Sequence, residues 1–347
     1  MGAAKKILIF TGAGFGVPLG LPTSTEFEAD IRSDISPVTT YLMDYIGGVN
    51  AKDIEWILSG LESFQREVGF VEFLLPKLVS KVGVTQPGYE TFKAGINNQK
   101  SDAKKELARI KRALFSRLMA FDEKEATSLW KNVLEEIRAF DQDASISIFT
   151  SNYDLTFETA IENLGNDLAD LNFSSVDYGF SEQFGRMVYD PTRDFAWNAK
   201  TIEFLKVHGS IDWHRDAKGQ CSRSMSTTVP NDPDQMVILY PGAKGVAENE
   251  PFLSIHGRLD TRLAEADAAF VVGFAFRDAY INSIFYNALR RDHSPRVFYL
   301  NPLPMEKHPE GSFAPKLAGS YSAFRHVNKG IENKSFPMGL ADLLASS

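Results

Sequence analysis

The stretch Lys6-Ile7-Leu8-Ile9-Phe10-Thr11-Gly12-Ala13-Gly14 runs from an unbroken apolar segment directly into a glycine-rich turn. A short apolar run closed by glycines is typical of a buried parallel strand that delivers the chain into a tight loop. Each of five further apolar runs is followed within one to three residues by Gly, Asn, His or Pro: 144–149, 204–207, 236–239, 268–272 and 296–300. Six such runs, several separated by helix-like segments, predict an α/β fold with a doubly wound parallel sheet.

The segment between the first two runs is about 130 residues long, far more than one crossover helix needs. Apolar residues recur there at steps of three or four, which predicts two helices: Leu107, Ile110, Leu114, Leu118 and Phe121 mark the first, and Leu129, Val133, Ile137 and Phe140 the second. We therefore expect a large helical subdomain at residues 30–140, inserted after the first strand of a sheet domain that comprises residues 1–29 and 141–347.

Composition restricts the class of protein. The chain has 347 residues, a net charge of -8, 44% hydrophobic residues and one cysteine, Cys221. This hydrophobic content can form a core, and a single cysteine excludes both an internal disulfide framework and a zinc ribbon of four thiolates. Without a signal-peptide core or an apolar run of about 18 residues, we expect a cytoplasmic protein that binds no membrane. The acidic balance argues against sequence-specific nucleic-acid binding.

Ligands of doubly wound sheets bind beyond the carboxyl ends of the strands, so the residues after each run are candidates. The glycines of Gly12-Ala13-Gly14 would let the backbone approach a diphosphate, and free N–H groups there would hold negative charge, although a structural turn is the alternative. Asn152 and Asp154 suit a sugar hydroxyl or a heteroaromatic substituent, but their spacing also fits an Asx-turn. His208, followed by a glycine, could serve as a general base, whereas a lone histidine is more often structural.

Two later motifs follow the same rule. Residues 273–278, Gly-Phe-Ala-Phe-Arg-Asp, form a glycine turn leading into a helix and could hold phosphate. Asn301, followed by a proline, could place an amide near a ribose or a base.

In this order along the chain, the motifs resemble the sirtuin superfamily, and more narrowly the sirtuin-like domains of prokaryotic antiphage systems. The resemblance is carried by residues 11–15, 20–23, 152–154, 206–213 and 273–278. It implies a Rossmann-like fold that binds NAD+ as substrate, without a metal ion.

The resemblance also implies roles for individual residues. Asn152 and His208 would line the nicotinamide–ribose pocket and be catalytic, with Asn152 positioning ribose hydroxyls or water and His208 acting as the base. Asp154 would hold the nicotinamide end. The full set of implied cofactor-binding residues is Gly12, Ala13, Gly14, Phe15, Pro22, Asp154, Gly273, Phe274 and Asn301.

Two departures from the family pattern bear on the activity. Gly16 stands where the family usually has serine, and residues 23–25, Thr-Ser-Thr, stand where the deacylases carry Asp-Phe-Arg. Together with the missing zinc cysteines, they favour an NAD+ hydrolase that releases nicotinamide and ADP-ribose. A protein deacylase, an ADP-ribosyltransferase and a non-catalytic module that binds NAD or ADP-ribose are the alternatives.

An uncontrolled NAD+ hydrolase would kill its host, so we expect its activity to be gated. The resemblance implies an effector of antiphage defence that depletes NAD after infection is sensed, as in abortive infection. The sensor would be a separate protein, such as a HerA-type ATPase or a short Argonaute. Self-assembly into a homo-oligomer through the helical insertion is the other expected form of gating.

Overall fold

The structure, a computed structural model, describes residues 4–23, 26–27, 29, 58, 86–193, 196–224, 236–239, 249–308 and 311–329. The chain divides into two compact units. The first comprises Met1–Thr23, Arg117–Leu239 and Gly245–Ser347, and the second comprises Ser24–Ser116 and Tyr240–Lys244. All candidate residues lie in the first unit.

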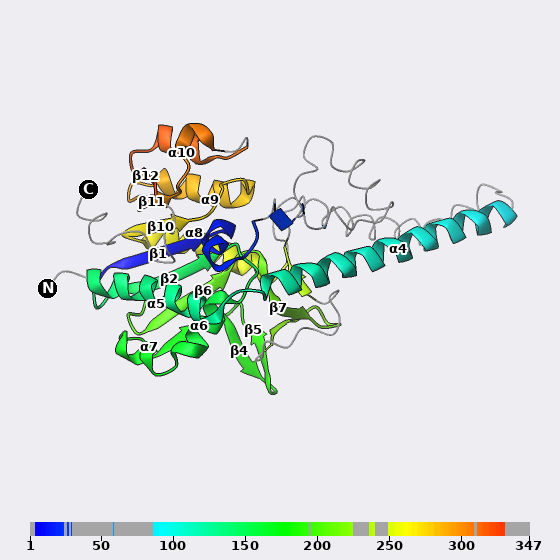
Figure 1. Cartoon of the computed structure of the whole chain (residues 1–347), viewed down its shortest axis with the longest axis horizontal. Helices are drawn as coiled ribbons and strands as arrows, with labels where there is room; N and C mark the ends of the chain where they lie inside the picture. The colour runs from blue at the N-terminus through cyan, green and yellow to red at the C-terminus, as the bar shows by residue number, and fades with distance from the viewer. Residues whose placement is uncertain are drawn as a thin grey trace. The chain divides into compact units, whose positions relative to one another are not determined.

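A parallel sheet of seven strands is the centre of the first unit (Figure 1). Its strands are β1 (Lys6–Thr11), β2 (Ser145–Thr150), β3 (Ser175–Asp177), β6 (Thr201–Lys206), β10 (Ala268–Val272), β11 (Arg296–Leu300) and β12 (Phe324–Val327). They lie in the order β12-β11-β10-β1-β2-β6-β3, and every neighbouring pair is parallel. The strand order reverses between β1 and β10, which makes this the topological switch point. The predicted doubly wound α/β fold is confirmed.

A second sheet of five antiparallel strands contains β4 (Phe180–Gln183), β5 (Arg186–Tyr189), β7 (Gly209–Arg215), β8 (Cys221–Arg223) and β9 (Met236–Ile238). The apolar run 236–239, predicted as a strand of the parallel sheet, instead forms β9 and pairs antiparallel with β7. That part of the prediction was wrong because apolar character identifies a strand but not its partner. Gly209, at φ +86°, brings the start of β7 directly against the Val237 backbone.

The helices of the first unit are α5 (Glu123–Phe140), α6 (Thr156–Leu164), α7 (Asp167–Asp170), α8 (Phe252–Glu265), α9 (Ala279–Leu289) and α10 (Ala314–Ser320), with short 3-10 turns at η1 (Ala13–Phe15), η2 (Val17–Leu19) and η5 (Met305–Lys307). The long helix α4 (Gln86–Leu118) belongs mainly to the second unit. Helices α4 and α5 are the two that the sequence predicts. The predicted insertion at residues 30–140 includes α5, which lies in the first unit. The limits of the inserted subdomain therefore stay a prediction.

The core lies on both faces of the parallel sheet because side chains alternate along each strand. Ile7 and Ile9 of β1 join the buried cluster with α5, α6 and α7, whereas Leu8 and Phe10 join the cluster with α8, α9 and α10. Burying one such side chain contributes about 1.5–3 kcal/mol to the free energy of folding, so the packing on both faces stabilises the sheet. Within the described part of the chain, no helix combines the length and apolar character that crossing a bilayer needs.

Candidate active site

Two glycine-containing loops interlock at the switch point: residues 12–16, which follow β1 and are called the glycine loop, and the 273–278 loop, which follows β10. The Gly14 amide donates to the Gly273 carbonyl over 2.9 Å. A Cβ on Gly12 would lie 2.7 Å from the Phe274 Cα, and one on Gly14 would lie 2.9 Å from the Gly273 Cα. Gly273 has φ +66°, and its Cβ would collide with the Phe15 amide nitrogen. These glycines are therefore required by the contact of two backbones.

The backbone amides of the glycine loop are mostly used by the protein itself. Those that donate to protein carbonyls belong to Gly12, Gly14, Phe15 and Gly16. Among the described residues, only the Ala13 amide of this loop makes no such bond, and Ala13 is exposed. The expectation of several free N–H groups that hold negative charge is thus reduced to one donor at Ala13, because two amides bond within the loop and two bond to the Val272 and Gly273 carbonyls.

The side chains around the glycine loop fix its shape. Phe15 is buried against Trp130, with 4.6 Å between ring centroids, and Pro22 is half-buried. A Cβ on Gly16 would lie 2.9 Å from Cδ1 of the buried Leu21. Leu21 thus occupies the space that a serine at position 16 would need, which gives a physical reason for the glycine there.

Asn152 lies beside the glycine loop. Its Nδ2 donates to the Gly12 carbonyl over 3.1 Å, and its backbone amide donates to the Thr150 Oγ1 over 3.0 Å. The neighbouring Ser151 amide donates to the Thr11 carbonyl over 2.9 Å. The loop after β2 is therefore bonded to the loop after β1, and the half-buried Asn152 amide is oriented by that contact.

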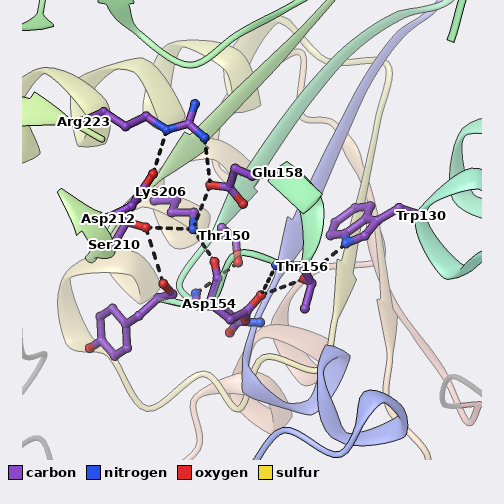
Figure 2. Close-up of polar contacts among 11 residues, drawn as sticks. Trp130, Thr150, Asp154, Thr156, Glu158, Lys206, Ser210, Asp212 and Arg223 are labelled. Atoms are coloured by element: carbon purple, nitrogen blue, oxygen red, sulfur yellow. Dashed lines mark hydrogen bonds and ion pairs between the residues drawn. The ribbon is translucent and has the colours of Figure 1, made fainter. Parts of the chain in front are cut away.

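Asp154 lies two residues before α6, which begins at Thr156. Its carboxylate accepts from the Thr156 amide over 3.0 Å and from the Thr156 hydroxyl over 2.7 Å. The Trp130 indole donates to that hydroxyl over 3.3 Å, as Figure 2 shows. Because this carboxylate accepts from the amide two residues later, the Asx-turn that the spacing allowed is present before α6. The Asp154 side chain is buried there, at 6% exposed.

His208 follows β6 and is 3% exposed. Its Nε2 lies 2.8 Å from Oδ2 of Asp278, the residue before α9. The other oxygen, Oδ1, accepts from the Tyr280 and Ile281 amides over 2.8 and 2.9 Å. Burial opposes ionisation of Asp278, but hydrogen bonding and charge from His208 and the two amides outweigh it and lower the pKa of this carboxyl. Asp278 is therefore a carboxylate at neutral pH.

A second histidine, His256, is bonded to the backbone of the residue before His208. His256 of α8 donates from Nε2 to the Val207 carbonyl over 2.9 Å, and its ring lies 4.8 Å from that of Tyr280. Burial, with repulsion from His208 as a smaller contribution, lowers the pKa of His256 to about 4. His256 is consequently neutral near pH 7 and holds the backbone beside His208 without adding charge.

A buried ionic cluster surrounds Lys206 (Figure 2). Lys206 is 2% exposed, and its Nζ lies 2.9 Å from both Glu158 Oε1 and Ser210 Oγ and also contacts the Asp154 carbonyl. Burial raises the pKa of Glu158, opposed by the positive charge of Lys206. An ammonium so enclosed connects the loop after β2 with the strands on both sides of His208. It therefore stabilises the position of both predicted catalytic residues.

Two predicted cofactor contacts are used locally. Asn301 donates from Nδ2 to the Tyr299 hydroxyl over 2.6 Å and accepts from the Leu303 amide at Oδ1 over 2.9 Å. Phe274 is 7% exposed and packs edge-on against Phe10, with 4.9 Å between ring centroids. Hydrogen bonds thus join the loops after β1, β2, β6 and β10, whereas the Asn301 side chain bonds to the end of β11 and to its own loop.

A cavity of about 270 Å³ lies elsewhere in the first unit, beside the amino-terminal halves of β2 and β6. Its lining residues are Ile146, Asp177, Ala196, Trp197, Asn198, Thr201, Glu203 and Arg262. Arg262 and Glu203 pair with each other over 2.6 Å, so their charges are compensated within the protein. The predicted catalytic residues, Asn152 and His208, lie instead beyond the carboxyl ends of β2 and β6.

The partners of His208 could not be predicted from the sequence. Asp278 ends the motif at residues 273–278, and an aspartate before an apolar helical pattern is the usual signal of an N-cap. Nothing local shows that it also binds a histidine 70 positions away. His256 and the ion pair of Lys206 with Glu158 carry no local signal of proximity to the site.

Fold and site together define a doubly wound α/β protein with an amide, a histidine and a glycine loop at its switch point. Residues 146–318 match the family described as the SIR2-like domain. No curated protein matches the sequence.

Several solved structures are similar to this chain. One is a Sir2 homologue in complex with NAD: the TM-score is 0.42 and the identity 13%, over 87% of this chain and 79% of that one. A mutant Sir2 homologue with ADP-ribose has a TM-score of 0.43 and 13% identity, over 89% and 86%. A complex of Sir2 with a p53 peptide and NAD+ has a TM-score of 0.40 and 11% identity, over 99% and 92%.

Proposed function

We propose that the chain is an NAD+ hydrolase that cleaves the bond between nicotinamide and ribose. The observation that carries this proposal is the position of His208, paired with a carboxylate and two residues after β6, in the segment that matches the SIR2-like domain. Asn152, bonded to the glycine loop, lies after the neighbouring strand. A base and an oriented amide on adjacent strand ends are the groups this reaction needs.

In the proposed reaction, water displaces nicotinamide from the ribose. An oxygen of water bonds to the ribose carbon, the carbon–nitrogen bond breaks, and its electron pair goes to the nicotinamide ring nitrogen. His208 takes the proton that the water loses. Because the nicotinamide leaving group is cationic in NAD+ and departs neutral, it needs no general acid, and orientation matters most.

The other residues hold the substrate in this proposal. Asn152 positions the ribose hydroxyls or the water, and Asp154 holds the nicotinamide carboxamide with Oδ2, the oxygen that does not accept from Thr156. The amide of Ala13, an exposed residue, donates to a phosphate oxygen. These neutral donors and one carboxylate fit a ligand whose nicotinamide is cationic and whose riboses are neutral.

The test is to incubate the purified chain with NAD+, alone and with the products of neighbouring genes, and to quantify nicotinamide and ADP-ribose. We expect Asn152→Ala and His208→Ala each to lower turnover by about 10²-fold or more, because each removes a group acting in the transition state. The matched controls Asn166→Ala and His293→Ala change exposed residues and should keep full turnover.

Two results would overturn this proposal: no nicotinamide release under any of these conditions, or full turnover by both site variants. A product that appears only with an acylated peptide, as O-acyl-ADP-ribose, would assign a deacylase instead. Tight NAD+ binding without nicotinamide release would assign a binding module.

We further propose that this activity serves antiphage defence in the cytoplasm and is gated by a separate sensor protein or by assembly of a homo-oligomer. The support is the resemblance of the motifs, together with the toxicity of unregulated NAD+ depletion. Light scattering after size exclusion, run alone and with the products of neighbouring genes, measures the state of assembly. A constitutively active monomer would contradict the gating.

A further inference from the structure

The contact between His208 and Asp278 has a geometry that a helix cap alone does not need. The Asp278 oxygen Oδ1 takes both amides of the cap, which leaves Oδ2 for the histidine at 2.8 Å. The side chains are 3% and 10% exposed, so water does not compete strongly for either group. The two amides prevent the carboxylate from rotating away, and the imidazole is therefore held in one orientation.

We propose that Asp278 is a positioning residue for His208: it holds the proton on Nε2 and leaves Nδ1 as the nitrogen that accepts the proton from water. This inference rests on the proposed hydrolase function, since it names the atom that performs the base's task. A carboxylate only accepts hydrogen bonds, so Nε2 must be the donor in this pair. In a neutral imidazole the remaining nitrogen then carries the lone pair.

The loop that carries Asp278 is held in a costly conformation. Phe276 has φ +53°, which is unfavourable for a residue with a side chain. It is 0% exposed and packs edge-on between Phe274 and Phe285, at 5.0 and 5.3 Å between centroids. Its carbonyl accepts from the Phe313 amide and the Asn282 side chain over 2.8 and 3.0 Å. Strain that is so firmly enclosed is typical of functional sites.

The chain contains a natural comparison for this residue. Asp122 caps α5 with the same backbone conformation, φ -78° and ψ 116°, against -76° and 111° for Asp278. It accepts from the Lys124 and Glu125 amides over 2.9 and 3.0 Å through one oxygen. No histidine is bonded to Asp122 in the described part of the chain. Comparing the two aspartates separates capping from positioning.

The decisive variant is Asp278→Asn, with Asp122→Asn as its matched control. Asparagine caps as well as aspartate, so both proteins should keep a Tm within about 2 °C of the unmodified chain. At position 278, however, the amide Nδ2 donates to Nε2, which moves the ring proton to Nδ1 and blocks the base. We expect kcat to fall about 10²–10⁴-fold, with KM within about threefold and Asp122→Asn unaffected.

A second readout does not depend on turnover. In protein labelled with ¹⁵N-histidine, the shifts of His208 should report a proton on Nε2 in the unmodified chain and on Nδ1 in Asp278→Asn. His208→Gln identifies the signals among the six histidines. An unchanged tautomer, or an Asp278→Asn enzyme with full kcat, would overturn the positioning role. If the unmodified chain releases no nicotinamide, the proposed function fails, and the tautomer still decides the inference.

Discussion

Gly273 shows how much of the site depends on single backbone positions. At φ +66°, any side chain is strained, and its Cβ would meet the backbone of Gly14 and Phe15. Gly20 has a similar φ of +81°, but a Cβ there would meet nothing within 4 Å. The two glycines therefore separate conformational strain from collision.

We expect Gly20→Ala to lower the free energy of unfolding by about 1 kcal/mol, the usual cost of a left-handed alanine. Gly273→Ala should lower it by about 3 kcal/mol more or prevent folding, because backbone atoms cannot move aside as a flexible side chain can. Urea unfolding followed by circular dichroism measures both. Equal effects of the two substitutions would contradict the interlocking of the loops.

At the scale of elements, the β4–β5 hairpin contains an unfavourable turn residue. Gln183 pairs with Arg186, so the turn comprises Phe184 and Gly185, with φ values of +52° and +73°. Positive φ at both positions corresponds to a type I′ turn, in which asparagine is preferred at the first position. Phe184 is fully exposed and loses no buried contact when it is replaced.

We expect Phe184→Asn to raise the free energy of unfolding by about 0.5–1 kcal/mol, since asparagine tolerates the left-handed conformation better than phenylalanine. Phe184→Ala is the control, because alanine removes the ring but has no such tolerance, and its stability should hardly change. Urea unfolding followed by tryptophan fluorescence is suitable, because Trp213 packs against Phe180 of the same hairpin at 5.1 Å. Equal stability of the two variants would argue against turn strain.

At the scale of the whole molecule, buried histidines predict acid lability. The pKa of His256 is about 4 in the folded chain, against the ordinary value of 6.5. Between these values the unfolded chain binds the proton and the folded chain does not, so stability is full above pH 6.5 and falls as the pH drops towards 4. Burial also lowers the pKa of His214 and His308, which adds to the loss.

His256→Gln tests this dependence, because glutamine keeps a donor for the Val207 carbonyl but does not titrate. Between pH 7 and 4.5 the unmodified chain should lose on the order of 2 kcal/mol more of its free energy of unfolding than the variant. Urea unfolding at a series of pH values measures the difference. Parallel pH profiles would contradict a neutral, buried His256.

The sequence by itself determined the strands at 6–11, 145–150, 268–272 and 296–300, the helices α4 and α5, and the residues that follow the strands. Apolar periodicity and glycine after a strand are local signals, and they act within a few residues of the chain. The resemblance of the motifs added Asn152 and His208 as candidates. The match of residues 146–318 to the SIR2-like domain agrees with that resemblance.

Only the tertiary structure decided which strands pair and which polar groups meet. The run at 236–239 is part of the antiparallel sheet because it pairs with β7. Asp278 reached His208, and Lys206 reached Glu158, across 70 and 48 positions of the chain. Four amides of the glycine loop bond to protein carbonyls, two of them at Val272 and Gly273, because β10 and the loop after it lie against this loop. Hydrogen bonds, burial and backbone contact depend on neighbours in space, and a local pattern contains no information about them.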